Sequence, residues 1–262
     1  MADRSKTIVH GEDVYQFDEV KHVHTLNGKR LHGVTTLIDK TLSKPALIPW
    51  AVKMCAEYIM TNCPKRNTDG YEFYEVTEPD IVEAKRAHTK KKTDAGDWGT
   101  RVHDACEVWC ATGEMPADED ITPSVMNFVK FIENNGFRVL DTERPVWSKE
   151  WWLGGIFDLV LEKDGKVYIA DIKTSSGIYD SQFIQMGAYY KCLVENGWVK
   201  DYGVDKFEGA IVINLKKDNT FAFCMSTALD TMVDTYQGII NINENMPALE
   251  AITKAVKYTT NF

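Results

Sequence analysis

The stretch GGIFDLVLEKDGKVYIADIKTSS, residues 154–176, predicts a β-hairpin and decides the fold class. Two apolar runs flank Asp164-Gly165, a dipeptide that favours a two-residue hairpin turn because both residues tolerate positive φ. The runs also carry Asp158, Asp171 and Lys173, although charged residues inside a buried strand normally need partners. The stretch therefore predicts a sheet with a cluster of charges within it.

A two-residue turn has a consequence for the pairing of these charges. It places Asp158 directly opposite Asp171, with their Cβ atoms about 4.5–5.5 Å apart, and Lys173 on the same face. Two carboxylates this close repel each other, and the repulsion raises the pKa of one of them. A divalent cation bound between them would remove the repulsion. A lysine beside them suits a phosphate or a polarised water. A bulged three-residue loop would shift the pairing, and the alternative interpretation is a surface hairpin whose acids are solvated or pair with Lys173.

The remaining elements follow from periodicity and turn residues. Asn27-Gly28 predicts an early hairpin, residues 61–78 are turn-rich, and a long polar helix is expected from Glu78-Pro79 with a break at residues 94–99. We predict one domain over residues 1–262, with the hairpin and a helical lobe over 1–98 and an α/β core over 99–262. Further helices are expected over about residues 50–60, 100–111, 122–135, 180–197 and from 229 onwards, and strands over about 137–147, 152–162, 166–173, 208–215 and 220–226.

Composition excludes several classes of protein. The formal net charge of −9 disfavours a chain that only coats nucleic acid, but it permits an enzyme with a local basic groove and an acidic metal site. Six cysteines without a Cys-x-x-Cys pair predict reduced thiols and no iron–sulfur cluster. The sequence has no phosphate-binding loop of the kind that predicts ATP use. The polar first residues and the lack of an 18-residue apolar run predict no signal peptide and no membrane span, hence a cytoplasmic protein.

Four motifs together resemble the PD-(D/E)XK nucleases, in their RecB-like and phage-type exonuclease branch. Gly155-x-x-Asp158 followed by Asp171-Ile172-Lys173 resembles the core of that family. GTRVHDACE (99–107) resembles its Gly-x-x-x-His helix, QMGAYY (185–190) its Gln-x-x-x-Tyr helix, and residues 31–59 its N-terminal region. The resemblance spans about residues 20–195 and implies a restriction-endonuclease-like mixed central sheet flanked by helices, with a helical N-terminal lobe.

The resemblance also implies roles for particular residues. Asp158 and Asp171 would ligate Mg²⁺ or Mn²⁺ together with the Ile172 carbonyl, and His103 would add a ligand from its helix. Lys173 would position or activate the attacking water and stabilise the developing charge. The chain departs from the family pattern in two places. It has Asp171 where many members have Glu, and Phe157 where they have Pro.

Other residues of the motifs have two interpretations each. Gln185 and Tyr189, one helical turn apart, would touch substrate or support Lys173, and otherwise form ordinary helix surface. Glu107, four residues after His103, would face the metal or be a solvated helix acid. Arg101 and the lysines Lys90, Lys91 and Lys92 would track phosphates, although such charge runs are usually solvated. A single helical histidine is more often satisfied than a ligand, and for Glu143 we prefer a loop acid.

The function implied is a metal-dependent deoxyribonuclease, favoured as an exonuclease by the branch and not by the residues. It would act in recombination, repair or phage DNA processing, in the host cytoplasm if phage-encoded. The alternatives are a non-catalytic nucleic-acid or protein-binding module on the same fold, an endonuclease of the same family, and a hydrolase of another phosphoester. The expected partners are DNA and a single-strand-annealing or other recombination protein, and a homo-oligomer is a further option. Without a motor motif, any processivity must come from topology, such as a ring, or from a partner.

Overall fold

A computed structural model describes residues 5–255 of the chain. These residues form two compact units, the larger comprising residues 5–42 and 105–255 and the smaller residues 43–104. No helix within the described residues combines the length and the apolar character that crossing a membrane would require. The two units are described separately below.

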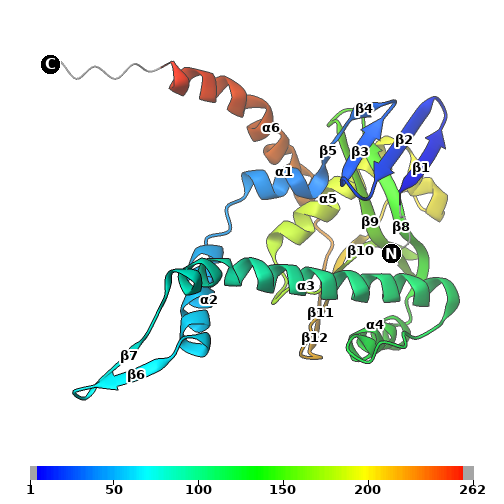
Figure 1. Cartoon of the computed structure of the whole chain (residues 1–262). Helices are drawn as coiled ribbons and strands as arrows, with labels where there is room; N and C mark the ends of the chain where they lie inside the picture. The colour runs from blue at the N-terminus through cyan, green and yellow to red at the C-terminus, as the bar shows by residue number, and fades with distance from the viewer. Residues whose placement is uncertain (1–4, 256–262) are drawn as a thin grey trace. The chain divides into compact units, whose positions relative to one another are not determined.

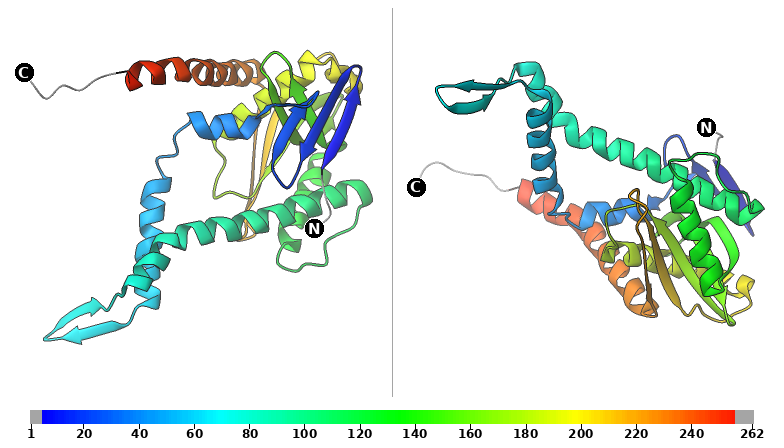
Figure 2. Two further views of the ribbon diagram at one scale, coloured as in Figure 1. Left: turned by 45° about the horizontal axis from the view of Figure 1, so that its top comes forward. Right: turned by 90° about the horizontal axis from the view of Figure 1, so that it is seen from below.

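The larger unit is built on a mixed sheet, in which β9 and β10 are antiparallel while β10 and β11 are parallel. The strand order is β12-β11-β10-β9-β5, and β8 also pairs with β9. Helices border this sheet on both sides (Figures 1 and 2). The predicted fold class, a mixed central sheet flanked by helices, is therefore confirmed. The strands are β5 (His32–Gly33), β8 (Arg138–Ser148), β9 (Leu153–Lys163), β10 (Lys166–Lys173), β11 (Gly209–Leu215) and β12 (Phe221–Ser226).

The two faces of the sheet pack against different helices. Ile213 of β11 pairs with Phe223 of β12, whose ring centroid lies 5.0 Å from that of Phe131 on α4. The next residue along β11 towards its start, Val212, points to the opposite face because side chains alternate, and it belongs to the buried cluster that α5 and α6 help to build. The helices of this unit are α1 (Val34–Thr41), α4 (Thr122–Asn135), α5 (Asp180–Glu195), η1 (Trp198–Tyr202) and α6 (Leu229–Lys254).

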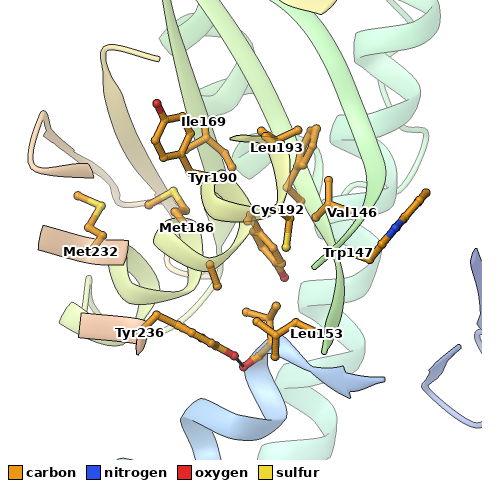
Figure 3. Packing of buried hydrophobic residues seen from close by; sticks show 14 of the residues in the cluster. Val146, Trp147, Leu153, Ile169, Met186, Tyr190, Cys192, Leu193, Met232 and Tyr236 are labelled. Carbon is orange, nitrogen blue, oxygen red and sulfur yellow. Dashed lines mark hydrogen bonds between the residues drawn. The ribbon is translucent and has the colours of Figure 1, made fainter. Parts of the chain in front are cut away.

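The core of this unit lies between α5, α6 and the sheet (Figure 3). Met186 of α5 and Ile169 of β10 are completely buried there, and each such side chain contributes about 1.5–3 kcal/mol relative to exposure. Tyr236 of α6 is also fully buried, and its hydroxyl donates a hydrogen bond of 2.9 Å to the carbonyl of Val34 at the start of α1. This bond ties α1 to α6, the last helix within the described residues.

The N-terminal residues form a second, antiparallel sheet of the larger unit. Asn27 and Gly28 both adopt positive φ between β3 and β4, which confirms the predicted hairpin turn. Tyr15 is fully buried, and its ring stacks on that of Trp147 of β8 with the centroids 5.2 Å apart. The small sheet therefore shares the core of the large one. Its strands are β1 (Lys6–His10), β2 (Asp13–Asp18), β3 (Val23–Leu26) and β4 (Lys29–Arg30).

The smaller unit contains α2 (Leu47–Asn62), a hairpin of β6 (Lys65–Thr68) and β7 (Tyr71–Tyr74), and most of α3 (Glu78–Thr112). The predicted break at residues 94–99 is wrong, because α3 continues through this stretch as one helix of 35 residues.

The wrong prediction comes from treating Gly96 and Gly99 as helix breakers. Gly96 and Gly99 weaken a helix by about 1 kcal/mol each relative to alanine, but they leave every backbone hydrogen bond possible. The β6–β7 hairpin was also not predicted, although Asp69 and Gly70 form its turn with positive φ and carry the usual hairpin signal.

Candidate metal and phosphate site

The β9–β10 hairpin has the predicted register. Asp164 and Gly165 form the turn with φ of +51° and +75°, and pairing runs from Lys163↔Lys166 to Leu159↔Ala170. The same register brings Asp158 next to Asp171, immediately beyond the last of these pairs.

Beyond the last backbone pair, the side chain of Asp158 accepts a hydrogen bond from the backbone of the neighbouring strand. The Ile172 N–H donates a hydrogen bond of 2.7 Å to Oδ2 of Asp158. The Asp158 carboxylate is therefore held in place by the strand that carries Asp171 and Lys173.

Glu143 of β8 occupies the position that faces Asp158 from the other side. The neighbouring pairs are Thr142↔Leu159 and Arg144↔Phe157, so Glu143 lies between them opposite Asp158. Its φ is +49°, a conformation that costs a residue with a side chain about 1–2 kcal/mol. Such strain often accompanies functional positions because it places a side chain where a regular strand would not. From the sequence alone a loop acid is expected at this position, because the pattern of apolar and polar residues does not reveal a positive φ at a glutamate.

The helix α3 carries two further residues of the predicted site, His103 and Glu107. It runs unbroken into the larger unit, where burial raises the pKa of the Cys106 thiol and the charges of Cys110 and Asp158 raise it further. His103 lies one turn before Cys106 on the same helix. The predicted ligand His103 belongs to the smaller unit, and its role stays a prediction. Among the described residues of the larger unit, Glu143 and Asp158 form an acidic group, in which one carboxylate oxygen of each lies within 4.8 Å of the other. Glu107, one turn further along α3, is not in this group.

Asp171 lies beside this group and is bound by other partners. It is 1% exposed, and its Oδ2 lies 2.6 Å from Nζ of Lys173. Gln185 of α5 extends its Nε2 towards Oδ1 of Asp171 at 3.4 Å and donates to the Tyr189 hydroxyl at 3.0 Å. Gly155 of β9 makes room for this arrangement, because a Cβ there would lie 2.4 Å from Cε1 of Tyr189.

The ionisation of these groups is set by burial and by each other. Burial raises the pKa of Asp158, against the opposing effects of Lys173 and the Ile172 N–H. Burial by itself would lower the pKa of Lys173, but Asp171 and Asp158 outweigh it and the net shift is upward. Burial, followed by the charge of Asp171, raises the pKa of Tyr189 well above its usual value. Lys173 is therefore a stable cation and Tyr189 a neutral donor or acceptor near pH 7.

Two kinds of predicted residue remain, the Ile172 carbonyl and the basic residues of α3. Ile172, whose carbonyl is a predicted ligand, pairs with Ile213 of β11 and is held by its N–H bond to Asp158. The candidate phosphate contacts on α3 are exposed; they are Lys90, Lys91, Lys92 and Arg101.

One buried polar residue next to the site was not anticipated. Asn214 of β11 pairs with Lys173 and is completely buried. The only sequence signal is a single asparagine in the apolar run IVINL, residues 211–215. Its neighbours could not be read from the chain, because a parallel pair is joined by a long crossover rather than by a turn.

Comparisons with known proteins leave the family open. No family model and no curated protein matches the chain. Among solved structures, SSO0001 is similar over 50% of this chain and 58% of its own, less than two thirds of its length, with 18% identity and a TM-score of 0.29. The structure of LHK-Exo in complex with dAMP matches 86% of this chain and 92% of its own, with 9% identity and a TM-score of 0.39.

An alkaline exonuclease (LHK-Exo) from Laribacter hongkongensis matches 86% of this chain and 95% of its own, with 8% identity and a TM-score of 0.36. Likenesses of this size carry no argument about activity, so the function has to be argued from the site.

Proposed function

We propose that this protein is a metal-dependent nuclease that hydrolyses DNA phosphodiester bonds, acting as an exonuclease. The observation that supports the proposal best is the ion pair of Lys173 with the nearly fully buried Asp171, next to the carboxylates of Asp158 and Glu143. Burying charges is costly unless they are paired or bind a ligand, so a hairpin that keeps three of them in an apolar sheet serves more than packing.

The side chains present suit a divalent cation. The carboxylates of Glu143 and Asp158 approach each other within 4.8 Å, and oxygen-rich sets of this kind suit Mg²⁺ or Mn²⁺. Residues His103, Glu143 and Asp158 would hold the ion, with Asp171 and the Ile172 carbonyl as further ligands. A bound cation would lower the pKa of a coordinated water and offset charge on the scissile phosphate.

Residues of the chain supply the remaining steps. The Lys173 ammonium stays charged near pH 7, so it is suited to hold a non-bridging phosphate oxygen or to orient the attacking water. Gln185 restrains the Asp171 carboxylate, and Tyr189 restrains Gln185. The Ile172 N–H keeps the Asp158 carboxylate from rotating away. Such positioning accounts for much of the rate in phosphoryl transfer.

Cleavage of end-labelled DNA tests the proposal. With Mg²⁺ or Mn²⁺, linear DNA should be degraded and covalently closed circular DNA left intact, and EDTA should abolish the reaction. Lys173→Ala and Asp171→Ala should each lose at least about 100-fold in rate while staying folded. Lys166→Ala is the matched control, because this lysine lies on the same strand but pairs with the surface residue Glu208.

Each alternative has its own outcome. Cleavage of circular DNA would indicate an endonuclease, and turnover of a small phosphodiester but not of DNA would indicate another hydrolase. DNA binding without cleavage would indicate a binding module. Undiminished DNA cleavage by either site variant would refute the assignment of the site.

A further inference from the structure

Asn214 is a buried amide without a partner, placed next to the proposed catalytic lysine. It pairs with Lys173 across the parallel β10–β11 ladder, and its other neighbour is Ala222 of β12. It is 0% exposed, and among the residues that the structure describes neither its Oδ1 nor its Nδ2 has a hydrogen-bond partner. Leaving a buried amide unsatisfied is unfavourable, so such a group in a folded protein calls for an explanation.

The geometry of the sheet directs this amide to the site. Paired residues on neighbouring strands point to the same face, so Asn214 shares the face of Lys173, one strand spacing of about 4.8 Å away. The Lys173 side chain is long enough to swing between the two strands, and it is 23% exposed. Ala222 on the far side offers no polar atom, which leaves Lys173 as the cation nearest in register to Oδ1 of Asn214.

Lys173 needs a second acceptor if the proposed function is correct. Its ammonium now lies 2.6 Å from Oδ2 of Asp171. The same carboxylate is a proposed ligand for a divalent cation, and two cations cannot share one oxygen without strong repulsion. An ammonium that leaves Asp171 without finding another acceptor would lose its compensation in a buried site.

We propose that Asn214 is a positioning residue, whose Oδ1 accepts a hydrogen bond from Lys173 when Asp171 turns to a bound divalent cation. This inference rests on the proposed function. The unsatisfied amide of the metal-free protein is the acceptor that the metal-bound state uses. Asn214 thereby lowers the free energy of separating Lys173 from Asp171, and it keeps the ammonium beside the reacting phosphate.

Mn²⁺ binding without DNA tests the inference. Asn214→Leu removes the acceptor but keeps a similar volume. We expect it to bind Mn²⁺ about 10- to 100-fold more weakly by calorimetry or paramagnetic resonance, the loss expected for one hydrogen bond to a charged group. Its melting temperature without metal should equal or exceed that of the wild type, because an unsatisfied amide has gone. Asn214→Asp keeps an oxygen acceptor and should bind Mn²⁺ at least as well as the wild type.

A double-mutant cycle identifies the lysine as the partner. In a Lys173→Met background, Asn214→Leu should not weaken Mn²⁺ binding further, because no ammonium remains to be placed. Ser124→Ala is the control for a buried polar residue elsewhere, since this hydroxyl donates to the Lys216 carbonyl. It should leave Mn²⁺ affinity unchanged.

Three outcomes would overturn the inference. Wild-type Mn²⁺ affinity in folded Asn214→Leu, or an equal loss with and without Lys173, would remove the role of Asn214 and leave the nuclease proposal intact. A wild-type protein that neither binds Mn²⁺ nor cleaves DNA would refute both.

Discussion

The Ile172 N–H donates a 2.7 Å hydrogen bond to Oδ2 of Asp158, so the carboxylate of one strand completes the backbone hydrogen bonding of the next. This bond joins the fold to the site. The Asp158 carboxylate therefore has two roles, as a proposed cation ligand and as the acceptor for a buried backbone N–H. Substitutions at Asp158 can separate these two roles.

Asp158→Ala and Asp158→Asn should differ in stability but not in activity. Both remove the charge and should abolish cleavage. Alanine also leaves the Ile172 N–H without an acceptor, which should lower the free energy of unfolding by about 1–3 kcal/mol, whereas the asparagine oxygen can still accept. Urea denaturation of the two variants measures the difference. Equal stabilities would show that the N–H finds another acceptor.

Metal-free stability should depend on pH through Asp158. Burial raises the pKa of this carboxyl in the folded protein, so folding retains a proton that the unfolded chain loses above about pH 3.9. The stability of the wild type relative to Asp158→Asn is therefore greatest below that pH and falls as the pH rises through the folded-state pKa. Denaturation midpoints of both proteins between pH 3 and 8 in EDTA should diverge in favour of the variant. A constant difference would contradict the shift.

The hairpin was predictable from sequence because its information is local. Asp164-Gly165 specifies a two-residue turn, and the turn sets the register over the five pairs up to Leu159↔Ala170. The strands and helices after residue 122 have the expected order and nearly the expected bounds. The same local reasoning failed at Gly96 and Gly99, where hydrogen bonding along α3 outweighs the weak helix propensity of glycine.

Two features of the site depend on the pairing of strands that are distant in the sequence, and they could not be predicted from the sequence. Glu143 is defined by its place opposite Asp158 in the β8–β9 ladder and by a strained backbone. Asn214 is defined by a parallel pair with Lys173 that the long crossover through α5 brings about. A single sequence shows neither, because the pattern of apolar residues identifies strands but not their neighbours.

Gly155→Ala should damage the site through Tyr189. The added methyl would meet the Tyr189 ring at 2.4 Å in a packed core, which should destabilise the protein by about 1–3 kcal/mol and displace Gln185 from Asp171. Thermal unfolding and cleavage rates check both effects.

Gly96→Ala is the control, because nothing lies within 4 Å of its added methyl and α3 is helical there. It should raise stability by about 0.5–1 kcal/mol. A loss of stability in this control would contradict the gain expected from replacing a helical glycine by alanine.

Glu143→Ala and Glu143→Gly should separate strain from ligand binding. Both remove the carboxylate and should weaken Mn²⁺ binding to a similar extent, since Glu143 belongs to the group around Asp158. The free energy of unfolding of the glycine variant should exceed that of the alanine variant by about 1–2 kcal/mol, because the φ of +49° is free of strain only for glycine.

Asn219, at φ of +62° in the β11–β12 turn, provides the control. Its glycine variant should likewise be more stable than its alanine variant, but both should bind Mn²⁺ like the wild type. Equal stability of the two Glu143 variants would mean that the backbone relaxes once the side chain is gone, and the glutamate itself would then hold β8 in this conformation.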